Sequence, residues 1–70
     1  MEKVDNKKTG SRLRDLRKDA KMTVKEMAEA VGVSESSYSQ YEQGVKRPRD
    51  DVKCRIANVH NVSVQSIFFE

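Results

Sequence analysis

The chain has 70 residues, of which 36% are hydrophobic and 36% are charged. This length predicts one small domain whose core is at the margin of independent stability. One cysteine and one histidine exclude an intrachain disulfide and a Cys/His metal cluster, and neither a long apolar run nor an apolar signal region is present. We therefore expect a cytoplasmic protein without a membrane segment, metal or cofactor.

The net charge of +3 is unevenly distributed along the chain. Residues 1–21 carry eight Lys/Arg against four Asp/Glu, residues 22–44 carry one against four, and residues 45–53 carry four against two. Basic segments thus flank a segment that has almost no basic side chains. An anionic partner explains this pattern, and a surface that simply keeps a small domain soluble explains it equally well.

Residues 1–8 show no apolar period, and we expect a flexible basic tail there, followed by one domain over residues 9–70. Leu13, Leu16 and Ala20 recur at helical spacing and predict a first helix over about 10–20.

Two further helices are predicted by their end signals. Thr23 and Glu26 have the T-x-x-E spacing of a capping box, which predicts a helix over 24–31. The next helix, over 35–42, starts after the N-cap residue Ser34. A glycine follows each of these helices, at positions 32 and 44, where it permits the left-handed conformation that ends a helix.

The last part of the chain predicts two more helices. A fourth helix starts at Asp50-Asp51, where acidic side chains suit the helix dipole, and Asn61 ends it. Its expected inner face consists of Val52, Ile56 and Val59, with Cys54 as a small core residue. A hydrophobic staple of Val62 with Ile67 opens a last short helix, and Phe68 closes the core beside the first helix. The expected fold is an all-α, compact bundle of five short helices.

Short motifs at fixed spacing extend over nearly the whole chain. They are L-R-x-L-R at 13–17, M-T at 22–23, E-M-A at 26–28, V-G-V-S at 31–34, Y-E-Q-G at 41–44, R-P at 47–48, R-I-A at 55–57 and N-V-S-V at 61–64. With these motifs, residues 10–69 resemble the lambda-repressor-like helix-turn-helix family, the phage Cro and repressor type, also known as XRE-like transcriptional regulators. The helices over 24–31 and 35–42, joined by G-V-S, match the helix-turn-helix layout.

The resemblance implies that the helix over 35–42 lies in the DNA major groove. The positions that then point at base edges are Glu35, Ser36, Ser37 and Gln40. Their chemistry suits this role, because Gln pairs with two groups of adenine, Ser bonds to several bases and Glu accepts from the cytosine amine. The alternative is that S-E-S-S is only an N-cap and first turn, where serine is common.

The resemblance also implies phosphate contacts, from Arg12, Thr23, Lys46, Arg47 and Arg49. For each basic side chain the alternative is a solvated charge. The chain departs from the family pattern in having Val24 where a glutamine is frequent, and no Lys or Arg on the reading helix. We therefore expect weak binding by one protomer and a greater need for a dimer.

Three further expectations concern structural roles. Arg17 and Glu42 occupy the positions of a recurrent ion pair of the family, with two unrelated surface charges as the alternative. Asp50 and Lys53 stand where leucines are common in the family, so the core under the fourth helix should be thinner. Phe69 is the expected dimer contact.

Enzymatic chemistry is a poor fit. Cys54 and His60 are six residues apart and lack a third partner, and the chain has no glycine-rich phosphate loop. We expect no enzyme and no small-molecule ligand. Two function classes remain: a homodimeric regulator of a phage or mobile element, binding a palindromic operator in double-stranded DNA, or a protein-interaction module of the same fold, such as an antitoxin or adaptor.

Overall fold

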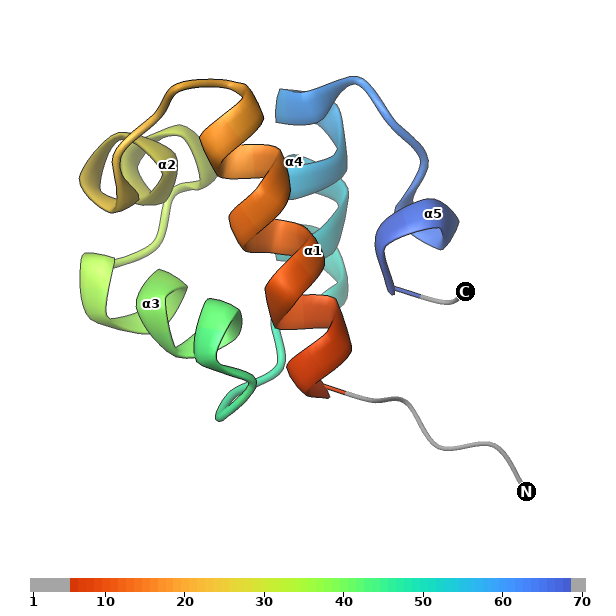
Figure 1. The fold of residues 1–70 in the computed structure, drawn as a ribbon, viewed down its shortest axis with the longest axis horizontal. Helices are drawn as coiled ribbons and strands as arrows, with labels where there is room; N and C mark the ends of the chain where they lie inside the picture. Colours follow the sequence, from red (N-terminus) through yellow and green to blue (C-terminus); the bar gives the residue numbers. More distant parts are fainter. Residues whose placement is uncertain (1–5, 69–70) are drawn as a thin grey trace.

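The computed structural model describes residues 6–68 as five α-helices with no strand among them (Figure 1). The helices are α1 (Asn6–Asp19), α2 (Val24–Val31), α3 (Glu35–Gln43), α4 (Asp50–His60) and α5 (Val64–Phe68). Helix α1 packs against α3 and α5, α2 packs against α3 and α4, and α4 packs against α5. The all-α bundle of five short helices is confirmed. None of these helices is long and apolar enough to cross a membrane.

The start of α1 differs from the prediction. The helix begins at Asn6, so residues 6–8 are helical and do not belong to a tail, while residues 1–5 lie outside the described residues. The added turn leads to Thr9 and Gly10, which are both buried. Neither residue is apolar in the usual sense, so a search for apolar periodicity does not detect this buried turn.

The short turn between α2 and α3 is stabilised by Gly32, Ser34 and Arg55. Gly32 adopts the left-handed conformation with φ of 79°, and its N–H donates to the carbonyls of Ala28 and Glu29. Ser34 then caps α3 by accepting a hydrogen bond from the N–H of Ser37 at 3.1 Å. A third element holds this turn, since Arg55 of α4 donates to the carbonyl of Val31 at 3.3 Å.

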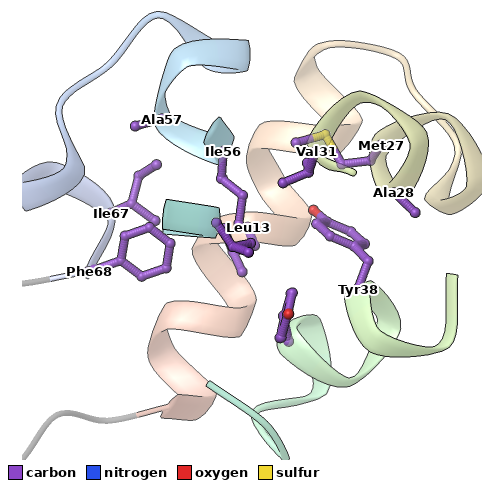
Figure 2. Close-up of a cluster of buried hydrophobic side chains, with 11 residues drawn as sticks. Leu13, Met27, Ala28, Val31, Tyr38, Ile56, Ala57, Ile67 and Phe68 are labelled. Carbon is purple, nitrogen blue, oxygen red and sulfur yellow. The ribbon is translucent and has the colours of Figure 1, made fainter. Parts of the chain in front are cut away.

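The core takes side chains from all five helices, which gather around Leu13 of α1 (Figure 2). Its members are Leu13, Met27, Ala28, Val31, Tyr38, Tyr41, Val52, Ile56, Ala57, Ile67 and Phe68. The expected burial of Ile67 and Phe68 is confirmed, with exposed fractions of 2% and 4%. Because α5 is only five residues long, we attribute its position mainly to these two side chains.

The predicted inner face of α4 is partly wrong. Cys54 is exposed and Val59 is 37% exposed, because the buried stripe of α4 runs through Val52, Lys53, Ile56 and Ala57. The predicted staple is not supported either, since Val62 is 39% exposed.

Lys53 occupies the place expected to weaken the core under α4. It is only 8% exposed, and its Nζ lies 5.5 Å from the centroid of the Phe68 ring and 3.8 Å from Oδ1 of Asp50. The aliphatic stem therefore fills the space that a leucine would fill, while the ammonium group gains a cation–π contact. The expectation of a thinner core is therefore wrong for Lys53, whereas the side chain of Asp50 is fully exposed and adds nothing to the core.

Candidate nucleic-acid interface

Helix α3 divides into a buried face and an outward face. Tyr38, Tyr41 and Glu42 are buried. The side chains that turn away from them, at about 100° per residue, form the outward face. We define this face by Ser36, Ser39, Gln40 and Gln43, together with Glu35, which is exposed in the first turn although helical geometry places it in line with Glu42 seven residues later.

The four residues predicted to contact bases do not all lie equally on this face. Glu35 and Ser36 are exposed, whereas Ser37 and Gln40 are half-buried. The Oγ atom of Ser37 accepts a hydrogen bond from Nζ of Lys46 at 3.5 Å, which places Ser37 at the edge of the outward face beside the following loop.

Two members of the outward face were missed by sequence reasoning. Nε2 of Gln43 donates to Oγ of Ser39 at 3.1 Å, so the two side chains form one polar unit at the end of α3. Helical spacing from Ser36 to Ser39, Gln40 and Gln43 is the signal that would have found them.

The first turns of α2 and α3 are both capped by hydroxyl side chains. Oγ1 of Thr23 accepts from the N–H of Glu26 at 3.1 Å, and Oε1 of Glu26 accepts from the N–H of Thr23 at 2.8 Å. Thr23 thus forms the predicted capping box, in which its hydroxyl oxygen accepts from the α2 backbone and its hydroxyl proton is not used. A capped helix still leaves N–H groups of its first residues without an intrahelical acceptor, and these can bind a phosphate.

The loop after α3 is a basic segment held at both ends. Gly44 ends α3 with φ of 77°, and buried Pro48 fixes the loop before α4 begins. Lys46, Arg47 and Arg49 are all exposed. Figure 1 shows that this loop lies beside the first turn of α1. We call residues 45–49 the basic loop.

Arg12 does not belong with the basic loop. It projects from the side of α1 opposite Gly10, Arg14 and Arg17, by helical geometry, and its Nη1 donates to the carbonyl of Ile67 at 3.0 Å. This hydrogen bond joins α1 to α5, so the side chain has a structural partner on the face away from α3.

Arg17 and Glu42 form an ion pair between α1 and α3. Nε and Nη2 of Arg17 donate to the two carboxylate oxygens of Glu42 at 2.7 Å and 3.1 Å. Nη1 of Arg17 also donates to the carbonyl of Met22 at 3.1 Å, immediately before the α2 cap. The hydrogen bond with Glu42 raises the pKa of Arg17. A second arginine, Arg14, approaches Oε1 of Glu42 at 3.8 Å.

Two other titratable groups are affected by burial. Burial raises the pKa of Tyr38, and the nearby carboxylate of Glu42 raises it further. Burial lowers the pKa of His60, whose Nε2 is enclosed without a hydrogen-bond partner among the described residues. Neither group has the setting of a catalytic acid or base.

Two other positions singled out from the sequence lie apart from this interface or outside the described residues. Cys54 is exposed on α4, and Phe69 lies outside the described residues. Within residues 6–68, no group of three or more His, Cys, Asp or Glu side chains is arranged to hold a metal ion.

Comparison with known protein sequences identifies the same kind of domain. The helix-turn-helix domain family matches residues 9–66. The uncharacterised HTH-type transcriptional regulator YobD of Bacillus subtilis is 43% identical over 56 residues, or 80% of this chain and 50% of YobD. The HTH-type transcriptional regulator ImmR of the same species is 35% identical over 54 residues, or 77% of this chain and 42% of ImmR. The chain spans half or less of these relatives.

Solved structures share the fold over most of the chain. The clp gene regulator ClgR from Corynebacterium glutamicum has a TM-score of 0.83 at 28% identity, over 96% of this chain and 71% of that chain. SinR, the master regulator for biofilm formation, in complex with DNA, has a TM-score of 0.78 at 28% identity, over 84% and 95%. The P22 c2 repressor has a TM-score of 0.84 at 24% identity, over 87% and 92%, and shows the fold alone.

The family match covers the two capped helices, the glycine turn between them and the scaffold helices α1 and α4. The chain belongs to the helix-turn-helix domain family.

Proposed function

We propose that this chain is a sequence-specific, double-stranded-DNA-binding transcriptional regulator of the cytoplasm. The observation that carries the proposal is the outward face of α3, which combines short hydroxyl side chains with two glutamines beside an exposed basic loop. Such side chains contribute little to helix stability, because Ser competes with the backbone for hydrogen bonds. They are well suited to hydrogen bonding with base edges.

In the proposed complex, α3 lies in the major groove, which is wide enough for one helix. Gln40 pairs with adenine through its amide, Ser36 bonds to a base edge and Glu35 accepts from a cytosine amine. Ser39 and Gln43 extend this readout toward the end of the helix. Ser37, at the edge of the outward face, reaches either a base or the adjoining backbone.

The DNA backbone is bound by groups around the outward face. Lys46, Arg47 and Arg49 of the basic loop are the proposed phosphate ligands, together with the first N–H groups of α2 and α3. Thr23 is a further proposed phosphate ligand through its hydroxyl proton, since its N–H already donates to Glu26. Arg12 is not among the proposed ligands, because it projects from the side of α1 away from α3 and donates to Ile67.

We further propose that the protein is a repressor or Cro-like switch of a phage or mobile element and binds a palindromic operator as a homodimer. One outward face carries no basic side chain, so its contribution to affinity is small and a second protomer is needed. With Ile67 and Phe68 buried in the monomer, Phe69 is the proposed dimer contact. Phe69→Asp should weaken binding to a palindrome far more than binding to an isolated half-site.

Similarity to named proteins supports the proposal. SinR was crystallised in complex with DNA and is 28% identical to this chain, and the relatives YobD and ImmR are named as transcriptional regulators. The order of capped helices, turn and basic loop is the physical arrangement that such a role requires.

Selection of bound sites from random duplex DNA tests the proposal. The expected result is one enriched palindromic site, with footprint protection of two half-sites about 34 Å apart. The matched control is a chain with Ser36→Ala and Gln40→Ala, which should keep its helical content and lose the enrichment. A wild-type chain that enriches no sequence would contradict the proposal.

A second candidate is a protein-interaction module of the same fold. It is favoured by Val59 and Val62, two exposed valines that form apolar surface near the α4–α5 turn. A SinR–SinI complex is also among the similar structures, with a TM-score of 0.81 at 28% identity. For this candidate, charge substitution at Val59 and Val62 abolishes partner binding while the outward face of α3 tolerates substitution.

A further inference from the structure

Gly10 lies where the backbone of α1 meets the backbone of the last turn of α3. A Cβ atom at Gly10 would lie 2.2 Å from the carbonyl oxygen of Glu42, 2.7 Å from its carbonyl carbon and 2.8 Å from the carbonyl oxygen of Tyr41. Real Cβ atoms essentially never make contacts under 3.0 Å. Only a hydrogen atom therefore fits between the two helices at this position.

The obstructing atoms belong to the backbone of α3, so no side-chain rotation relieves the collision. A methyl group at position 10 would force the carbonyl of Glu42 to retreat by about 1 Å, given the 2.2 Å contact. Gln43 follows directly along the chain and Gln40 lies in the same turn. A shift at Glu42 is therefore transmitted to two members of the outward face.

We propose that Gly10 is a positioning residue for DNA recognition, which sets the distance between α1 and α3 and thereby the direction of the outward face. This inference rests on the proposed function. Arg17 binds the side chain of the same residue, Glu42, whose carbonyl touches Gly10. The side-chain pair holds α3 to α1, and the glycine determines how closely the two backbones approach.

The consequence for binding follows from the size of the shift. Side chains that bind a ligand must lie within about 0.5 Å of their productive positions. The shift caused by a methyl group at position 10 exceeds this limit. Readout by Gln40 and Gln43 should suffer most. The basic loop is held in place by the buried Pro48 rather than by Gly10. Its phosphate contacts should therefore persist, and binding to random DNA should change little.

Helix propensity determines in which direction the melting temperature of Gly10→Ala should change. Alanine is a better helix former than glycine, so Gly10→Ala should raise the melting temperature if the position has free space. A rigid backbone contact predicts the opposite, a lower melting temperature. Ser11→Ala is the matched control, because Ser11 is an exposed neighbour in the same turn of α1.

A second control separates positioning from general loss of stability. Ile67→Val removes one buried methylene from α5, which packs on α1 and α4 and lies on the far side of the molecule from α3 (Figure 1). This variant should melt at a lower temperature and keep its preference for the operator over random DNA. Gly10→Ala should lose about tenfold of that preference, with random-DNA affinity within about twofold of wild type.

A readout without DNA distinguishes failure of this inference from failure of the proposed function. Amide ¹H–¹⁵N shifts of residues 36–43 should change in Gly10→Ala and stay at their wild-type values in Ser11→Ala. If Gly10→Ala unfolds in buffer, both measurements are made in sucrose, which favours the folded state. If the wild type shows no sequence preference, the proposed function fails and the shifts still test the contact. Unchanged α3 shifts, or an operator preference equal to that of Ile67→Val, would overturn the inference.

Discussion

Arg17 and Glu42 connect α1 to α3 through two charge-assisted hydrogen bonds, at 2.7 Å and 3.1 Å, in a nearly enclosed setting. Their side chains are only 15% and 5% exposed. Glu42 is the last buried residue of α3. This pair therefore helps to fix how α3, which carries the outward face, packs against α1. Removing the arginine would leave a carboxylate in a site with little water.

We predict that Arg17→Met destabilises the domain by about 3 kcal/mol, because the buried carboxylate of Glu42 would keep only the distant, half-exposed Arg14 as its partner. Urea unfolding measures this loss. Arg14→Met is the matched control: Arg14 approaches the same carboxylate at 3.8 Å but its side chain is 51% exposed, so its removal should cost less than about 1 kcal/mol. The double variant Arg17→Met, Glu42→Leu should recover part of the loss. Equal effects of the two arginine substitutions would contradict this account.

Gln40→Ala should cost about 1–3 kcal/mol on the best DNA site and relax the preference at one base position. Arg47→Ala should instead weaken operator and random DNA alike, because a phosphate contact carries no sequence information. Competition binding with a set of single-base operator variants measures both effects. Gln65→Ala, an exposed glutamine on α5, is the control and should change neither. Equal loss on operator and random DNA for Gln40→Ala would remove this residue from the readout.

Binding should depend strongly on salt, because the proposed ligands of the basic loop neutralise phosphates. If a dimer neutralises about six phosphates, the plot of log K against log salt should have a slope near −5. Arg49→Ala should make the slope shallower by about one unit for each phosphate that is no longer neutralised. Fluorescence anisotropy across a salt series gives the slope. An affinity that is constant between low and physiological salt would refute the phosphate contacts.

Much of the fold could be predicted because helix ends have local signals. The Thr23–Glu26 box and the Ser34 cap are formed by neighbouring residues, and Gly32 has the left-handed conformation predicted from its residue type. Such signals depend on interactions between residues three or four positions apart, which are visible in the sequence.

The errors have a common cause in interactions between distant residues. Arg12 reaches Ile67 across 55 positions, Gly10 meets the backbone of α3, and Lys53 is buried by packing beside Phe68. No local pattern predicts which face of α1 or α4 a neighbouring helix will cover. Gln43 is a different case, because its helical spacing from Ser36 and Gln40 is local and would have indicated its outward position.

Stability should fall on mild acidification because of His60. Burial lowers its pKa below the usual 6.5, so below pH 6.5 the unfolded chain binds a proton that the folded chain resists. The contribution of neutral His60 is therefore fully present above pH 6.5 and is lost as pH falls toward the lower folded pKa. Melting temperatures between pH 8 and pH 5 should show this decrease for wild type. His60→Gln should flatten the decrease near pH 6, and an unchanged profile would exclude His60 as its source.

The buried and outward faces of α3 have no residue in common. Tyr38, Tyr41 and Glu42 attach the helix to the domain, while the side chains that face outward have no part in the core. Helix α3 therefore keeps the side chains that are proposed to read DNA separate from the side chains that hold the fold together. Substituting the outward side chains would change the DNA sequence that is bound with little effect on the stability of the fold. Paralogues can therefore differ in their binding sites while they keep the same core.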